Sequence, residues 1–388
     1  MKKSNMKITK ILLLLLLGLL LSSIDSFSQP IKAESSTSSN FEYPILQAYT
    51  THGPIFIEYD SNFTDYGFPG IGSAGDPYRI ENYNITISGD YPILFGGNNT
   101  DHFVIQNCFL KTDTNAGIFL GKYYDMGNGT VEILNNIIIS ESNYGIILNG
   151  GNYSTITENN INSLYCCIQL DSCDFSLISK NTIHSKNDAG MDISFCSNIT
   201  VTKNTCLECS EGIILTYSDN SIITHNNITE SGNDGIYLQD SAYITISNNY
   251  FIESVSRGIY SSSSYNSVIT NNLFQGNGEY GISLVLSSSN NVVHHNAFID
   301  NNLAGTSQAN DDGSNNIWYD DVTSEGNYWN EWVSGSYSID GTASSVDPYP
   351  LGSMPVIPEY SSLSLAFLLT LCTLIIPVIS FVPRKKLK

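Results

Sequence analysis

Charged side chains that could do chemistry recur at a constant step in the middle of the chain. Glu211, Asp234 and Arg257 follow one another at intervals of 23 residues. Such a set could supply a general acid, a general base and a charge stabiliser for the cleavage of a polysaccharide. The alternative is a solvated acidic ridge with one ion pair between Asp234 and Arg257. The three residues are therefore candidates for catalysis and nothing more.

Two further sets of residues follow the same step. One is a set of glutamates, and the other is a pair of tyrosines, Tyr237 and Tyr260. Carboxylates stacked about 5 Å apart repel one another unless a cation or a proton lies between them, so the glutamates could bind Ca²⁺. Flat tyrosine rings would suit sugar rings, although paired tyrosines also simply stabilise sheets. The glutamates are Glu208, Glu230 and Glu253.

Cysteines could crosslink neighbouring repeats. Cys173 and Cys196 are also 23 residues apart. If their repeats pair at about 4.8 Å, the two residues come within disulfide range. The alternative is a pair of small buried thiols in a column that Gly and Ser otherwise fill. Cys206 falls on an apolar position and is expected in the core.

The six histidines offer no convergent metal site in this pattern. His225 and His295 occupy equivalent positions, but three repeats separate them, about 14 Å at 4.8 Å per repeat. Cys206 and Cys209 form a C-x-x-C pair without a second pair. We therefore expect solvated turn histidines, and neither copper nor zinc chemistry. Ca²⁺ is the cation that the carboxylates suggest.

The elements that must position these side chains are units of a regular repeat. A β-branched residue stands three places before an Asn, and after a first step of 29 the Asn recurs every 22 to 24 residues. A fixed period of this size indicates one structural unit stacked on copies of itself. The pairs are Val104/Asn107, Ile133/Asn136, Ile156/Asn159, Ile178/Asn181, Val201/Asn204, Ile223/Asn226, Ile246/Asn249, Ile269/Asn272 and Val293/Asn296.

Each unit also carries a Gly, followed by apolar residues at every second position. Alternation of this kind is typical of strands and excludes a helical repeat. No unit can bury its apolar face alone, so the sequence predicts an all-β, right-handed parallel β-helix of about nine coils. Stacked Asn side chains should form a hydrogen-bonded ladder. The glycines are Gly117, Gly145, Gly190, Gly212, Gly235, Gly258, Gly281 and Gly305.

The charge of the chain is strongly uneven. Residues 34–357 hold seven basic and 35 acidic side chains, a net charge near −28, and the other basic residues lie at the two ends. Such a surface repels nucleic acid and anionic lipid. It also disfavours a polyanionic substrate such as pectate, unless a cation bridges the two.

The two ends have the character of targeting segments. A basic stretch followed by an apolar core predicts a secretory signal peptide. An apolar stretch of 20 residues near the other end could span a bilayer, and the basic tail after it would stay cytoplasmic with the body outside. The predicted segments are a signal peptide (1–33), an N-terminal lead-in and cap (34–100), β-helix repeats (101–308), a Trp-rich cap and linker (309–357), a transmembrane helix (363–382) and a cytoplasmic tail (383–388).

Asn-x-Ser/Thr sequons agree with an exported, glycosylated body. In a chain so rich in Asn and Ser, several sequons arise by chance, and we expect two or three to be used. The candidates are Asn62, Asn84, Asn98, Asn128, Asn152, Asn198 and Asn227.

The two ends of the repeat region carry motifs of a known family. Residues 75–82 read GDPYRIEN, residues 326–329 read GNYW and residues 347–351 read DPYPL. With the Asn and Gly-Ile coils, they resemble the NosD-type β-helix proteins of the carbohydrate-binding and sugar-hydrolase class, which have a pectin-lyase-like fold. The resemblance covers about residues 70–351. Founding members assist assembly of a copper centre, but this sequence has no matching cluster of copper ligands.

We expect a membrane-anchored cell-surface β-helix that binds a glycan or surface polymer without catalysis. The first alternative is a polysaccharide lyase or glycoside hydrolase on the outer face. The absence of an Asp-Asp pair combined with a Gly-His-Gly motif weighs against it. Further alternatives are a structural spacer and a copper-protein maturation factor.

Overall fold

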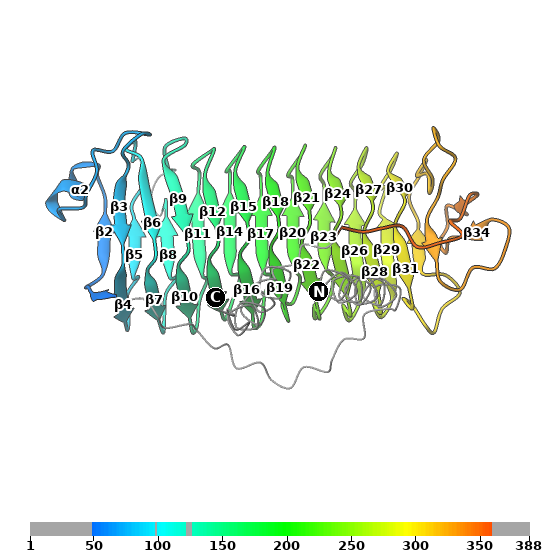
Figure 1. Cartoon of the computed structure of the whole chain (residues 1–388), viewed down its shortest axis with the longest axis horizontal. Helices are drawn as coiled ribbons and strands as arrows, with labels where there is room; N and C mark the ends of the chain where they lie inside the picture. Colours follow the sequence, from blue (N-terminus) through cyan, green and yellow to red (C-terminus); the bar gives the residue numbers. More distant parts are fainter. Residues whose placement is uncertain (1–48, 98, 122–125, 359–388) are drawn as a thin grey trace, which may run out of the picture. The chain divides into compact units, whose positions relative to one another are not determined.

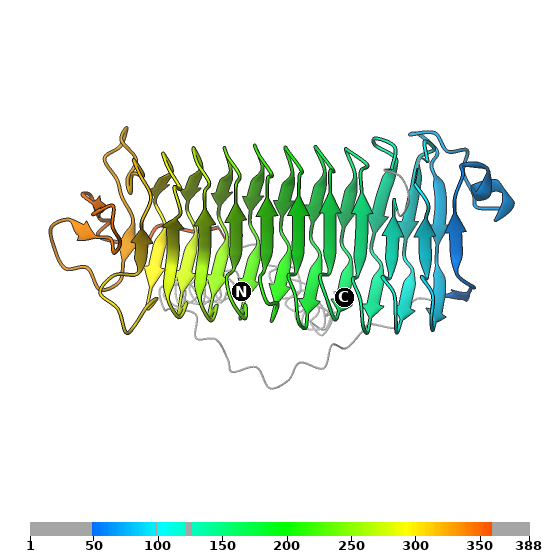
Figure 2. The same ribbon diagram turned by 180° about the vertical axis from the view of Figure 1, so that it is seen from behind.

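Three parallel β-sheets dominate the part of the chain described by the computed structural model, residues 49–97, 99–121 and 126–358. Neighbouring strands in each sheet are mostly three apart in the chain, so each circuit of the backbone supplies one strand to every sheet. Figure 1 and Figure 2 show the circuits stacked from β2 at one end to β34 at the other. The fold is the predicted all-β parallel β-helix, and each circuit is called a coil below.

Sheet 1 has 12 strands and begins each coil after the Asn corner. Its inward column runs from Ile138 to Phe298 and is buried, because alternate residues of a strand face opposite sides. The strands are β1 (Thr50–Thr51), β4 (Tyr83–Ile87), β7 (Phe109–Thr112), β10 (Ile137–Ser140), β13 (Asn160–Ser163), β16 (Thr182–Ser185), β19 (Thr205–Leu207), β22 (Asn227–Thr229), β25 (Tyr250–Ile252), β28 (Leu273–Gln275), β31 (Ala297–Ile299) and β33 (Tyr328–Trp329).

Sheet 2 has 11 strands and follows the Gly column. Pairs such as Ile213 and Leu215 face the core, and the residue between them faces outward. The strands are β2 (Ile55–Ile57), β5 (Ile93–Phe95), β8 (Ile118–Leu120), β11 (Ile146–Asn149), β14 (Ile168–Asp171), β17 (Met191–Ser194), β20 (Ile213–Thr216), β23 (Ile236–Gln239), β26 (Arg257–Ser262), β29 (Tyr280–Val285) and β32 (Ala309–Asp311).

Sheet 3 has ten strands and carries the β-branched column found in the sequence. Ile156, Ile178 and Val201 pair in register on successive coils and are buried. The strands are β3 (Tyr78–Glu81), β6 (Phe103–Gln106), β9 (Val131–Leu134), β12 (Thr155–Thr157), β15 (Leu177–Ser179), β18 (Thr200–Thr202), β21 (Ile222–Thr224), β24 (Thr245–Ser247), β27 (Val268–Thr270) and β30 (Val292–His294).

Asn side chains join the coils at the corner between sheets 3 and 1. Each amide Nδ2 donates to Oδ1 of the Asn on the next coil at 3.0 Å. The same oxygen accepts the backbone N–H of the previous Asn, so these buried amides are satisfied. The predicted ladder is confirmed for Asn136, Asn159, Asn181, Asn204, Asn226, Asn249, Asn272 and Asn296, and it ends at Asn327.

The first coil lies one residue out of the predicted register. Ile105 pairs with Ile133, whereas Val104 was expected to do so, and Cys108 therefore takes the place expected for Asn107. The Cys108 N–H donates to Asn136 Oδ1 at 2.9 Å. Asn107 has a φ of 53° and belongs to the preceding column. Asn tolerates this left-handed conformation, so both columns contain Asn and the sequence pattern is ambiguous here.

The Gly column is needed for close backbone approach. A Cβ built on Gly235 would lie 2.6 Å from the Gly258 carbonyl oxygen and 2.7 Å from a ring carbon of Phe251. A side chain there would push two coils apart. The last predicted member is wrong, because Gly281 bonds to the Gln308 carbonyl and Gly305 lies in the turn before β32.

Aromatic side chains close both ends of the coil stack. The short helix α2 (Ser61–Asp65) places Phe63 against Tyr78 at the N-terminal end. At the other end, Phe298, Trp329 and Tyr337 stack with ring centroids 4.1 and 3.9 Å apart. The antiparallel strands β34 (Tyr337–Ser338) and β35 (Val346–Asp347) cover this stack. The predicted Trp-rich cap is therefore a plug on the last coil.

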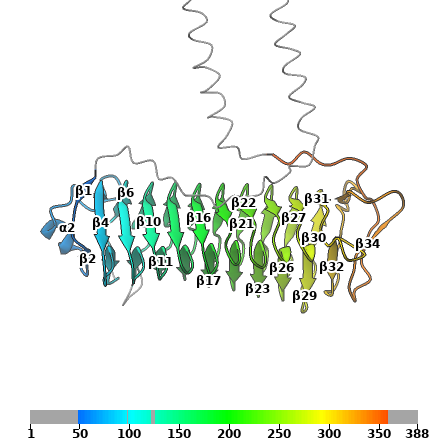
Figure 3. The ribbon, with the colours of Figure 1, turned by 90° about the horizontal axis from the view of Figure 1, so that it is seen from below.

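The last described residues return along the outer side of sheet 1 (Figure 3). Ile357 packs on Leu273 and Ala297, and its carbonyl accepts the Tyr250 hydroxyl at 3.0 Å. Within residues 49–97, 99–121 and 126–358, no helix is long and apolar enough to cross a bilayer. The predicted signal peptide, spanning segment and tail lie outside the described residues.

Candidate functional site

The predicted charged column is present on the edge of sheet 2. Glu211, Asp234 and Arg257 occupy equivalent positions on successive coils, each directly before its Gly or within the first residue of the strand. Asp234 Oδ1 accepts the Arg257 backbone N–H at 3.1 Å and lies 3.5 Å from Arg257 Nη1. Glu211 takes no part in this pair and instead accepts a hydrogen bond from Asn233 at 2.8 Å.

Burial changes the acid–base character of this face. Asp234 is only 5% exposed, and desolvation raises its pKa to about 6 despite the opposing charge of Arg257. Burial also raises the pKa of Asp192, which lies two coils earlier in the same outward column as Tyr237. Asp234 can therefore carry a proton close to neutral pH, which a general acid requires.

Arg257 links the carboxylates to the predicted tyrosine pair. Its guanidinium carbon lies 4.6 Å from the ring centre of Tyr260, a cation–π arrangement. The rings of Tyr237 and Tyr260 stack with centroids 5.4 Å apart. Arg257 Nη2 also lies 2.5 Å from a Glu279 oxygen. The sequence analysis missed Glu279 because it stands one residue before the charged column.

The predicted glutamate column is also present but does not gather around one point. Glu208, Glu230 and Glu253 stand at equivalent turn positions after sheet 1, each with φ between 53° and 56°. Glu208 pairs with His184 at 3.0 Å. Among the described residues, these carboxylates form no group of three with ligand atoms close enough to hold one ion. The geometry therefore gives no support to the Ca²⁺ prediction.

Exposed aromatic rings mark the turn between sheets 2 and 3 on six consecutive coils. They form an aromatic ridge in which every residue is 45% to 58% exposed. Two pairs stack nearly parallel with centroids 5.0 and 5.2 Å apart, and a third pair meets edge to face at 6.4 Å. The ridge consists of Tyr153, Phe175, Phe195, Tyr217, Tyr243 and Tyr265.

The backbone of this ridge is in a conformation that suits other residues better. Five of the six aromatic residues have φ between 50° and 63°. A bulky side chain in the left-handed region is strained, and such strain often marks functional positions. In the column that contains Phe175 and Tyr243, other coils place Asn198 and Asn220, the residue type that tolerates this backbone best. Stability alone therefore does not explain the aromatic choice.

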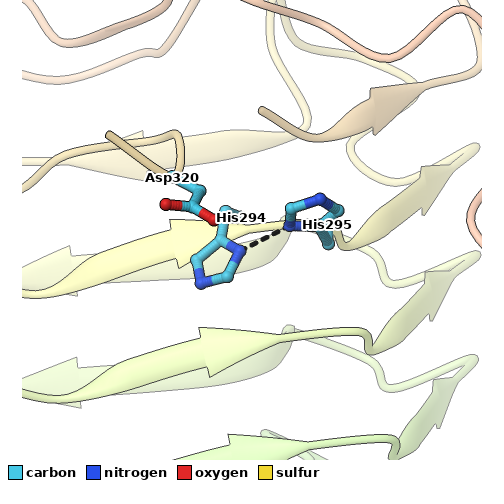
Figure 4. Close-up of side chains that lie close together, drawn as sticks. All are labelled: His294, His295 and Asp320. Atoms are coloured by element: carbon cyan, nitrogen blue, oxygen red, sulfur yellow. Dashed lines mark hydrogen bonds between the residues drawn. The ribbon is translucent and has the colours of Figure 1, made fainter. Parts of the chain in front are cut away.

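Two histidines and one carboxylate converge where the last coil meets the C-terminal cap, contrary to the predicted dispersal of the histidines. The ligand atoms of His294, His295 and Asp320 lie within 4.8 Å of one another (Figure 4). Burial lowers the pKa of His294, and the neighbouring His295 lowers it further. A hydrogen bond from the Val322 N–H lowers the pKa of Asp320. His225 lies in the same column as His295 but outside this cluster.

The seven described cysteines are all buried free thiols. Cys173 and Cys196 are neighbours in one column, as predicted, but the predicted disulfide is not formed in this structure. Instead, the Cys173 N–H donates to Cys196 Sγ at 3.1 Å. The same position holds Ser218 on the next coil, with an equivalent bond of 3.2 Å. Cys206 is 1% exposed, in agreement with its predicted place in the core.

The sequons differ in how free their side chains are. Asn128, Asn198 and Asn227 are exposed. Asn62 Oδ1 accepts two backbone N–H groups, and Asn152 Oδ1 accepts the Asp174 N–H at 2.6 Å. Asn84 is half-buried and accepts the Thr86 hydroxyl, and Asn98 lies outside the described residues.

A cavity of about 220 Å³ lies between the last coil and the cap. This volume is below the roughly 300 Å³ at which small-molecule sites usually begin. Polar side chains dominate its walls. They are Asp300, Asn301, Asn302, Leu303, Gly305, Thr306, Ser307, Gln308, Asn330 and Glu331.

Two family models match the sequence. A right-handed β-helix region matches residues 144–298, and a periplasmic copper-binding protein (NosD) model matches residues 73–195. No curated protein matches significantly. Within residues 73–195, the described side chains form no group of three metal-ligating residues, and burial raises the pKa of the Cys108 thiol to about 12. The residues of the NosD match therefore do not fit a copper centre.

Solved structures share the fold at low sequence identity. DFA-IIIase from Arthrobacter chlorophenolicus A6 in complex with GF2 is 13% identical, with a TM-score of 0.51 over 71% of this chain and 75% of that chain. The same protein in complex with DFA-III gives 14% identity and a TM-score of 0.51 over 71% and 76%. A mutant of the periplasmic alginate epimerase AlgG gives 15% and 0.45 over 63% and 74%. Such likeness extends to the fold alone.

Proposed function

Because this chain belongs to the NosD-type right-handed β-helix proteins, we propose that it uses the rod as a non-catalytic binding module for a glycan or surface polymer. The observation that carries the proposal is the aromatic ridge. Aromatic rings present flat apolar faces to the C–H groups of sugar rings. One exposed ring per coil over six coils offers a binding track for an extended chain rather than a closed pocket.

The charge of the body restricts the class of polymer. Residues 34–357 carry a net charge near −28, so repulsion disfavours polyanions and the expected ligand is neutral or cationic. We further propose that the rod is exported and tethered at the cell surface through residues 363–382. That tether would hold the ridge in place beside a polymer of the cell envelope.

The test is binding of the purified full chain, in detergent micelles, to a panel of neutral and charged polysaccharides. The informative variant is Phe175→Asn combined with Tyr217→Asn, which removes one ring from each parallel pair. Asn tolerates the left-handed backbone at both positions, and neither change creates a sequon. We expect affinity to fall at least about tenfold, or 1.4 kcal/mol, with the thermal midpoint unchanged or higher.

Tyr349→Asn is the matched control, because Tyr349 is 46% exposed and lies in the C-terminal cap, away from the ridge. It should leave polysaccharide binding unchanged. Failure of the native chain to bind any polysaccharide would refute the proposed function. Equal losses in the double variant and the control would remove the ridge from it.

A second candidate function is cleavage of a polysaccharide at Asp234, favoured by the pKa of about 6 and the adjacent Arg257. It requires new sugar ends to appear when the chain is incubated with a polysaccharide. Asp234→Asn should abolish their release and leave binding intact. Absence of new ends across the panel leaves binding as the function.

A further inference from the structure

The His294–His295–Asp320 cluster joins two separate parts of the fold. His294 is the last residue of β30, and His295 follows it with a φ of 54° that turns its ring toward the cap. Asp320 belongs to the cap, where it bridges Glu325. All three side chains are half-buried, so the cluster is shielded but still accessible to an ion.

The two imidazoles meet through lone-pair-bearing atoms. His294 Nδ1 lies 2.6 Å from His295 Nδ1, as the dashed line in Figure 4 shows. Two such nitrogens face each other only with a proton or a cation between them. A cation would satisfy both nitrogens at once, whereas a proton leaves one imidazole as donor and the other as acceptor. The nearby Thr270 hydroxyl lies 3.4 Å from His294 Nδ1.

The outer contacts orient these side chains in the manner of metal ligands. Glu325 accepts a hydrogen bond from His295 Nε2 at 2.8 Å, which places the His295 proton on Nε2 and leaves Nδ1 as a free ligand atom. A carboxylate behind a histidine is the usual second layer of a metal site. The Val322 N–H and the Thr323 hydroxyl hold the Asp320 carboxylate at 2.9 and 3.0 Å.

We propose that His294, His295 and Asp320 form a binding site for a divalent transition-metal ion such as Zn²⁺. Two imidazole nitrogens and one carboxylate oxygen are a ligand set typical of Zn²⁺, with water completing the coordination. Ca²⁺ prefers six to eight oxygen ligands and would bind poorly here. Bound metal would tie residue 320 of the cap to the last coil and hold the plug in place.

The test is isothermal titration of Zn²⁺ into the full chain, purified in detergent without a polyhistidine tag. We expect one equivalent to bind and the thermal midpoint to rise with Zn²⁺ concentration, because the ion binds the folded state. Substituting Co²⁺ should give the visible absorption of a nitrogen- and oxygen-ligated site. Ca²⁺ should leave the thermal midpoint unchanged.

Three variants locate the site. His295→Ala should abolish binding, and Glu325→Gln should weaken it by roughly 10- to 100-fold, because it removes only the orienting carboxylate. His225→Ala is the matched control, since it removes a histidine from the same column three coils away, and it should bind Zn²⁺ as the native chain does. The proposal fails if His295→Ala retains native affinity, or if Zn²⁺ produces neither heat nor thermal stabilisation.

Discussion

Asp234 Oδ1 accepts the backbone N–H of Arg257 on the next coil at 3.1 Å, so a nearly buried carboxyl is held by the residue that also carries its counter-charge. Arg257 shares that charge with Glu279, whose oxygen lies closer, at 2.5 Å, and is half exposed. Asp234 therefore receives incomplete compensation for its burial. This is why its pKa rises even though a guanidinium lies beside it.

The raised pKa makes the stability of the fold depend on pH. The folded form keeps the Asp234 proton up to about pH 6, whereas an unfolded Asp loses it near 3.8. The folded state thus binds more protons between these values. The contribution of Asp234 to the free energy of unfolding is present below pH 3.8 and is lost as the pH rises to about 6. The loss is roughly 3 kcal/mol at most.

Denaturant unfolding of the native chain and of Asp234→Asn between pH 4 and pH 7 measures this contribution. The variant cannot ionise, so its free energy of unfolding should fall less over this range, and it should exceed the native value at pH 7. Other carboxyl groups titrate in both proteins, so the difference between them isolates Asp234. Parallel pH profiles would contradict the assignment.

The Asn ladder should be the most sensitive polar feature of the rod. Asn226 Nδ2 donates to Val201 O at 2.9 Å and to Asn249 Oδ1 at 3.0 Å, and Asn226 Oδ1 accepts from Asn204. Asn226→Ala leaves several buried groups without partners and should cost about 2–4 kcal/mol of unfolding free energy. The exposed Asn233→Ala should cost less than roughly 0.5 kcal/mol. Similar losses in both variants would show that the ladder bonds contribute little.

The thiols of Cys173 and Cys196 should stay reduced and protected in the native protein. Both residues are fully buried, and the neighbouring thiol together with burial raises the pKa of Cys173. Thiolate is the reactive form, so alkylation of their peptides, followed by mass spectrometry, should require denaturation. Cys196→Ser should change stability by less than about 1 kcal/mol, because Ser218 makes the equivalent bond on the next coil. Isolation of a crosslinked Cys173–Cys196 peptide would restore the disulfide prediction.

Glycosylation in an exporting host should follow side-chain freedom. Asn128, Asn198 and Asn227 are exposed and should be modified. Asn62 and Asn152 hold backbone N–H groups and should remain bare, because modification would break those bonds. Glycopeptide mass spectrometry measures the occupancy of each site. High occupancy at Asn152 would mean that its turn opens before or during export.

The coil architecture could be predicted because its determinants repeat. The Gly and Asn columns return every coil, and each return is an independent sign of the same backbone geometry. The first coil was assigned one residue out of register, because Asn107 stands beside Cys108 and satisfies the same pattern. Only the pairing of Ile105 with Ile133 decides between them.

The site features that escaped prediction do not follow a single column. The ridge alternates between the column of Phe175 and that of Phe195, so neither column reads as aromatic. Asp320 belongs to the cap, where the repeat no longer relates sequence position to space. Its meeting with His294 and His295 depends on how the cap folds back over the last coil, which the period of the repeat does not encode.

The ladder amides all donate in one direction, from each coil to the next, until Asn327 receives the last bond and Asp347 accepts the N–H of Asn327 at 2.7 Å. Each interior coil therefore presents the same faces to both neighbours. A coil could be deleted or duplicated as a block without altering either end plug. The reach of the rod is thus an adjustable property in evolution and in engineering, separable from the chemistry of its caps.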